Sequence, residues 1–156
     1  MGFKGYLQKR RDDADLGQGL WRRNHDRFVR GLDRFHQILE RMPSEQMIDL
    51  MVPEANALAD LLPRVRAVAE QAHRLAPSDG ADIPYSPNGT YSDLNRSLSK
   101  AGNSLALCAE ALAMMRCSGE CSLNCAGKIS VARRVTTVEE HVAAAEVLVQ
   151  AAVLEK

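Results

Sequence analysis

The feature that most limits how this chain can fold is a seven-residue spacing of apolar side chains, which returns in four separate stretches. Within each stretch, apolar or aromatic residues follow one another at alternating steps of four and three. This spacing is typical of long helices that pack side by side. The stretches cover residues 21–42, 47–75, 91–115 and 131–152, and only His25, Glu54 and Cys108 depart from the apolar character. We therefore expect an all-α protein.

The segments between these stretches are typical of helix ends. Pro43 and Ser44 separate the first two, with Ser44 placed as an N-cap, and residues 76–89 contain the prolines and glycines of a longer connection. A glycine-containing segment separates the last two stretches. The predicted helices are about 18–42, 44–76, 90–117 and 129–155. Their number and connections predict an antiparallel up-down-up-down four-helix bundle with long helices.

The second predicted helix contains two prolines, Pro53 and Pro63. Proline removes a backbone donor and crowds the preceding turn, so we expect this helix to be kinked or broken near them. The apolar spacing continues in register through both prolines. One kinked helix, or a short helix followed closely by a long one, satisfies that pattern.

Length and net charge limit the classes of protein. The chain has 156 residues, which suits one domain, and 46% of them are apolar, which is enough for a core of ordinary size. Its 20 Lys and Arg balance its 20 Asp and Glu, and this argues against a nucleic-acid partner. No window approaches the roughly 20 apolar residues of a transmembrane helix. The first residues lack the apolar core of a secretory signal, so we expect a cytoplasmic protein.

The charge is distributed unevenly along the chain. Residues 1–41 contain ten basic and six acidic residues, which leaves this part at +4 and the remainder at −4. We expect residues 1–17 to form a basic segment that packs on a bundle made by residues 18–156. Interleaved aspartates favour charge pairing within the chain over an anionic partner. A less favoured alternative is contact with an anionic membrane through residues 3–11, which combine Phe3, Tyr6 and Leu7 with four cations.

Three of the four cysteines lie close together, at Cys117, Cys121 and Cys125. A helix through them would align the sulfurs, and neighbouring thiolates bind a soft metal such as zinc or exchange disulfides. Their spacing matches no common zinc or redox motif, so we favour ordinary reduced thiols. A thiol-based metal-binding or redox-sensing module is kept as the alternative function. Cys108 belongs to an apolar stretch, and we expect it to be a buried small side chain.

Catalytic motifs are not recognisable in the sequence, which favours a protein that is not an enzyme and has no cofactor. Glu70 and His73 have the spacing of a di-iron ligand pair but lie off the inward side of their helix, so we expect no such site. His25 and Glu54 occupy inward positions on the first two helices. They lie about one or two turns apart in the predicted hairpin, which is too far for us to expect a pair.

The third and fourth predicted helices carry more apolar residues than one packing face requires. The surplus residues are Leu107, Met114, Val147, Leu148 and Leu154. In a chain of this size, the simplest cover for such a surface is a second copy packed about a two-fold axis. We therefore expect an adaptor or self-associating protein that acts by protein–protein interaction, as a homodimer or with another protein.

Overall fold

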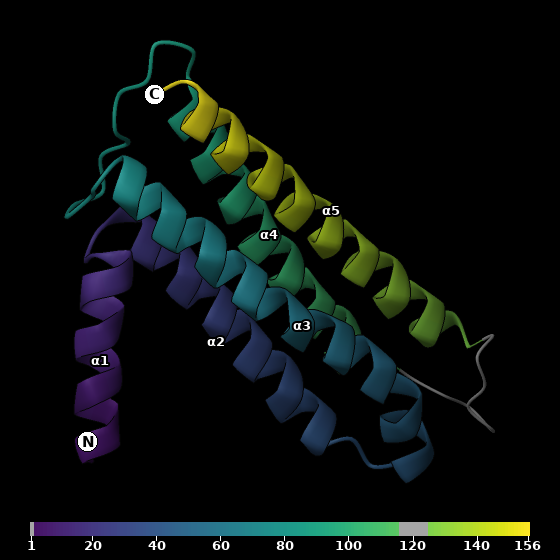
Figure 1. The fold of residues 1–156 in the computed structure, drawn as a ribbon. Coiled ribbons are helices and arrows are strands. Elements are labelled where there is room, and N and C mark those ends of the chain that lie inside the picture. The colour runs from purple at the N-terminus through teal and green to yellow at the C-terminus, as the bar shows by residue number, and fades with distance from the viewer. Residues whose placement is uncertain (1, 116–124) are drawn as a thin grey trace.

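The computed structural model describes residues 2–115 and 125–156, and within these ranges it contains five helices and no strand. The helices are α1 (Phe3–Leu16), α2 (Leu20–Glu40), α3 (Glu45–Leu75), α4 (Thr90–Ala113) and α5 (Ala126–Leu154). Helices α2 to α5 lie alongside one another, while α1 points away from them at an angle (Figure 1). The prediction of an all-α protein is confirmed for the described residues.

The apolar spacing correctly predicted which residues face the core. In α4 and α5, every residue of the seven-residue pattern that the structure describes is buried. The largest enclosed side chains of α2 are Trp21, Phe28 and Phe35, which follow the same spacing. Burying side chains of this size removes much apolar surface from water and supplies the main favourable term in folding. Long helices with one continuous apolar side therefore account for the architecture.

Contacts between helix ends show how the helices are arranged. The indole nitrogen of Trp21, at the start of α2, donates to the carbonyl of Ala76 after α3, at 2.9 Å. The hydroxyl of Thr90, at the start of α4, donates to Glu155 after α5, at 2.8 Å. Trp21 also packs against Tyr91 with ring centroids 6.4 Å apart. The starts of α2 and α4 and the ends of α3 and α5 thus meet at one end of the molecule.

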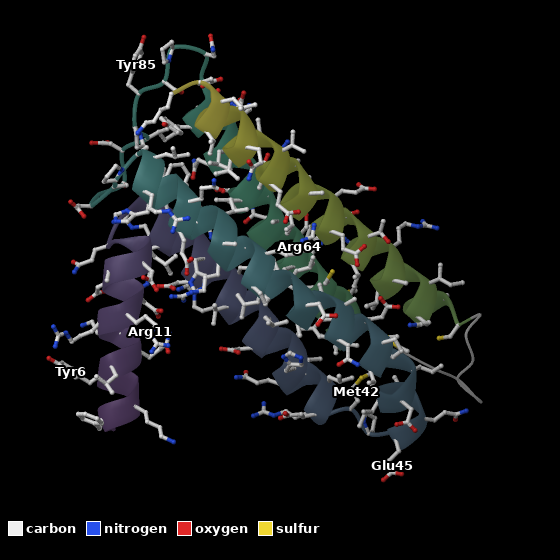
Figure 2. All side chains as sticks on the ribbon, viewed as in Figure 1. Tyr6, Arg11, Met42, Glu45, Arg64 and Tyr85 are labelled. Atoms are coloured by element: carbon white, nitrogen blue, oxygen red, sulfur yellow. The ribbon has the colours of Figure 1, made fainter. Side chains whose placement is uncertain are left out.

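The packing partners of each helix follow from the tertiary contacts. Helix α2 packs against α3 and α4, and α5 packs against the same two helices. Residues 76–89 carry the chain from α3 to α4, at the end marked by Tyr85, whereas Met42 lies at the opposite end, in the turn between α2 and α3 (Figure 2). The α2 and α5 helices therefore occupy opposite corners of this arrangement.

Helix α3 runs without interruption from Glu45 to Leu75 and contains both Pro53 and Pro63. The helix is therefore not broken near the prolines. It is also not divided into a short helix and a long one, so these two predictions are wrong. Both prolines are exposed, so they lie on the side of the helix away from the core and leave the apolar spacing intact. The predicted N-cap is present, since the Ser44 hydroxyl accepts a hydrogen bond from the backbone of Met47 at 3.4 Å.

Most of the helices begin and end within a few residues of their predicted boundaries, but not at the boundaries themselves. The third helix was predicted to reach residue 117, but α4 ends at Ala113 and residues 116–124 lie outside the described ranges. The fourth begins at Ala126 rather than at residue 129. None of the described helices is long and apolar enough to cross a membrane.

The N-terminal segment is a helix whose acidic residues, rather than its basic ones, attach it to the rest of the molecule. Asp13 accepts a hydrogen bond from Arg22 of α2 at 2.9 Å, and Asp12 accepts one from Arg66 of α3 at 2.8 Å. Leu16, in the last turn of α1, is fully buried. The helix ends at Gly17, whose positive φ of 72° favours glycine. A side chain at this position would also collide with the ring of His73.

Candidate interaction surfaces

The structure places four of the five predicted interface residues on the surface. The exposed fractions are 47% for Leu107, 76% for Met114, 69% for Val147 and 86% for Leu154. Leu148 is half-buried and packs against the core. Side chains of this size that remain exposed on otherwise buried helices are candidate contacts for a partner.

These residues do not form one continuous patch. Thr90 contacts Glu155, and the side chain of Met115 lies against Gly127, so α4 and α5 run in opposite directions. Met114 and Leu154 therefore lie near opposite ends of the helix pair, roughly 36 Å apart at 1.5 Å per residue. Leu107 lies beside Thr137 in a small hollow between the two helices, away from both ends.

Val147 and Leu154, by contrast, share one side of α5. Between Val142 and Leu154 the only charged residue is Glu146, which is paired with Arg64 of α3. Figure 2 shows Arg64 on the part of α3 that faces α5. The hydrogen bonds that Arg64 donates to Glu146 raise the pKa of Arg64 against the opposing effect of burial. Ala143 and Gln150 are also exposed, and we call the set Ala143, Val147, Gln150 and Leu154 the α5 outer face.

Of the three clustered cysteines, Cys117 and Cys121 lie outside the described residues. Cys125 is the residue before α5 and is half-buried, while Cys108 is buried as a free thiol within α4. No group of three metal-binding side chains occurs within residues 2–115 and 125–156. A zinc or redox site at Cys117, Cys121 and Cys125 therefore stays a prediction.

The two polar residues within the apolar stretches have separate partners. Glu54 of α3 accepts a hydrogen bond from the ammonium group of Lys128 of α5 at 2.6 Å. The Nδ1 atom of His25 lies 2.9 Å from a carboxylate oxygen of Asp26, its neighbour in the chain. His25 and Glu54 thus have different partners: His25 has one within α2, and Glu54 has one on α5. Glu70 is paired with Arg66 within α3, as expected for a residue on the side of the helix.

Buried polar side chains also join α2 to α4. The amide of Asn24 donates to Asn95 at 2.8 Å, and the hydroxyl of Ser99 donates to Asn24 at 3.1 Å. Asn24 is buried, so these bonds replace contacts with water that it would lose on folding. This network holds the two helices in register.

Sequence reasoning missed a second surface, which is a line of arginines on α2. Four exposed arginines of α2 and the exposed residue directly after the helix make up this arginine row: Arg23, Arg27, Arg30, Arg34 and Arg41. Their spacing of four, three, four and seven residues is the signal that could have revealed it, since this spacing places them along one side of a helix. A count of net charge for the whole chain hides such a row because acidic residues elsewhere cancel it.

The membrane-directed alternative for residues 3–11 is neither supported nor contradicted by the geometry. Phe3, Tyr6 and Leu7 are exposed, and Tyr6 points away from the other helices (Figure 2). Arg10 lies over the ring of Tyr6, with its guanidinium carbon 5.9 Å from the ring centroid. This part of α1 makes no ion pair with the described residues of the other helices.

Comparisons with protein-family models, with curated proteins and with solved structures found no significant match. Function is therefore argued from the surfaces themselves.

Proposed function

We propose that this protein acts by protein–protein interaction and self-associates through the α5 outer face. In this proposal α2 to α5 form an antiparallel up-down-up-down four-helix bundle, with α3 bent near Pro53 and Pro63. The bundle serves as a rigid support for the α5 outer face, because α5 is anchored on its other sides by α3 and α4.

The observation that carries this proposal is an exposed apolar surface without an unpaired charge. Val147 and Leu154 are 69% and 86% exposed, and the only charged residue from Val142 to Leu154 is already paired with Arg64. Two copies of such a surface can meet without burying an unpaired charge, which would be strongly unfavourable. A two-fold axis places each face on its equivalent, so an uncharged face is suited to a second copy.

The test is the mass of the native protein in solution. We expect a dimer for the wild type and a monomer for Val147→Glu at the same concentration, because two carboxylates would face each other in an apolar contact. Native mass spectrometry or light scattering after gel filtration distinguishes the two masses.

Ile129→Glu is the matched control. Ile129 is also exposed on α5 but lies near its first turn, far from Val147, so this variant should remain a dimer. Circular dichroism should show the same helix content in all three proteins. A wild-type monomer, or a dimer of Val147→Glu, would contradict the proposal.

A further inference from the structure

The arginine row forms a positively charged ridge along almost the whole of α2. At 100° per residue, its five members fall within a narrow sector of the helix, opposite the side that carries Trp21, Phe28 and Phe35. Arg23 and Arg41 are 18 positions apart, which corresponds to roughly 27 Å of helix. The ridge is therefore long enough to contact about five turns of a partner helix.

None of these five arginines forms an ion pair with another described residue, whereas other arginines of the protein do. Arg22, Arg64 and Arg66 are each bound by carboxylates at hydrogen-bonding distance. Asp33 and Glu40 lie on the neighbouring edge of α2, exposed and without an ion pair to the row. The guanidinium groups of the row are thus available to an external anion.

A hollow of about 310 Å³ lies beside the row, between α2 and α4. Its walls include Arg27, Arg30 and Arg34, and its floor consists of small residues, Gly31, Gly102 and Ala106. The stem of Arg27 lies across Gly102, where an added methyl group would come within 2.9 Å of the Arg27 Cδ atom. The absence of a side chain at Gly102 therefore lets the stem of Arg27 lie flat against α4, which supports this arginine at its base.

The side of α4 that borders this hollow is polar and nearly uncharged. It presents Ser99, Asn103 and Ala106, and the one carboxylate beyond them is the exposed Glu110. Neither an aromatic ring nor a large exposed apolar side chain lines the hollow. Base stacking on single-stranded nucleic acid needs such rings, and membrane insertion needs such apolar groups. Carboxylates, which pair with the fork of an arginine through two parallel hydrogen bonds, need neither.

We propose that the groove between α2 and α4 binds an acidic helix of a partner protein, with carboxylates at steps of three and four pairing with the arginine row. The row and such a helix have the same repeat, so successive carboxylates meet successive guanidinium groups. This surface is separate from the α5 outer face, since α2 and α5 occupy opposite corners of the molecule. The inference therefore does not depend on self-association.

The probe is a fluorescein-labelled helical peptide of about five turns, with glutamate at alternating steps of four and three and alanine or glutamine elsewhere. We expect saturable binding by fluorescence anisotropy at low salt, weakening as salt screens the charges. A peptide with every glutamate replaced by glutamine should not bind. The Arg27→Gln/Arg30→Gln/Arg34→Gln variant should bind the acidic peptide at least about tenfold more weakly.

A second variant separates charge from geometry. Lysine at the same three positions keeps the charge but lacks the planar fork, so its affinity should lie between those of the wild type and the glutamine variant. The matched control is Lys4→Gln/Lys9→Gln/Arg11→Gln, which makes the same change in net charge on α1 and should bind as the wild type does. All of the substituted residues are exposed, and circular dichroism should confirm unchanged folding.

Three results would overturn the inference. In the first, the wild type does not bind the acidic peptide. In the second, the glutamine variant of Arg27, Arg30 and Arg34 binds the peptide as tightly as the wild type does. In the third, the α1 control variant loses as much peptide affinity as that glutamine variant. A duplex or single-stranded DNA oligonucleotide that binds more tightly than the peptide would also overturn it, in favour of a nucleic-acid surface. Because these outcomes do not depend on mass, they are distinct from a failure of the dimer proposal.

Discussion

Cys108 is fully enclosed in the core, and its surroundings change its chemistry. Burial raises the pKa of its thiol to about 12, with Arg134 lowering and Glu54 raising it to a smaller extent. The thiol is therefore neutral at physiological pH, and a neutral thiol is a poor nucleophile and a poor metal ligand. Cys108 acts as a small apolar side chain, as its place in the apolar spacing predicted.

The raised pKa of Cys108 predicts that stability falls in alkaline solution. The ordinary pKa of the thiol is 9.0, so above this pH the unfolded chain loses a proton that the folded protein retains up to about 12. Over this interval the group should lower the free energy of unfolding by up to about 1.4 kcal/mol per pH unit. Urea unfolding at several pH values should show a shallower alkaline decline for Cys108→Ala than for the wild type.

Cys125→Ala is the control for this measurement, because Cys125 is only half-buried. The free energy of unfolding of the Cys125→Ala variant should decline with pH as steeply as that of the wild type. If Cys108→Ala and the wild type decline in parallel, then the Cys108 thiol is not held neutral by the core.

Among the helices, α1 is attached differently from the other four. Its buried apolar contact is confined to Leu16, and the remaining attachment consists of carboxylates that meet Arg22 and Arg66. Burial lowers the pKa of both arginines, but the hydrogen bonds that they donate to the α1 carboxylates, to Asp26 and to Glu70, together with the negative charges of these groups, outweigh it and raise the pKa of each. These ion pairs are only partly buried, and ion pairs near a protein surface typically contribute about 1 kcal/mol or less, so α1 should separate from the other helices more easily than any of them.

We predict that Asp12→Asn loosens α1 without unfolding the protein. Asp12 lies 2.8 Å from Arg66 and 4.0 Å from Arg22, so this change weakens two ion pairs at once. Hydrogen exchange should become faster in Phe3–Leu16, while global stability should change by less than about 1 kcal/mol. Lys9→Gln, on the exposed part of α1, should leave exchange unchanged. Equal exchange in Asp12→Asn and the wild type would show that the ion pairs of Asp12 do not hold the helix in place.

The difference between α1 and the other helices also explains how far the sequence could be interpreted. Burial in α2 to α5 is periodic, so the spacing of Leu94, Leu98 and Leu105 was enough to predict which side faces the core. The attachment of α1 depends on Asp12 meeting Arg66, a residue 54 positions away, and no local pattern encodes such a pair. The contact of Glu54 with Lys128, 74 positions away, was missed for the same reason.

The candidate surfaces were predictable only in part, because a sequence does not give the alignment of one helix against another. Leu107, Met114 and Leu154 have similar apolar character, yet the opposite directions of α4 and α5 place them at different levels of the molecule. Val147 and Leu154 are seven positions apart, as are Leu107 and Met114, so the spacing relates the members of each pair but not the two pairs to each other. The arginine row lies on α2 and the residue directly after it, so its spacing was accessible from the sequence.

On the scale of the whole molecule, a net charge of zero hides two surfaces of different character. The arginine row on α2 requires a partner of opposite charge, because two copies of it would repel each other. The α5 outer face has no unpaired charge and is compatible with itself. Since α2 and α5 lie at opposite corners, a dimer formed through α5 leaves both arginine rows facing solvent.

The proposed self-association through α5 would link the stability of the protein to its concentration. The folded dimer dissociates on unfolding, so each tenfold increase in protein concentration should stabilise it by about 1.4 kcal/mol. The Tm of the wild type should therefore rise with concentration, and so should that of Ile129→Glu. For Val147→Glu the Tm should be constant and equal to the wild-type value at high dilution. A wild-type Tm independent of concentration would mean that the α5 outer face, with Val147 and Leu154, remains in solvent and that the dimer proposal is wrong.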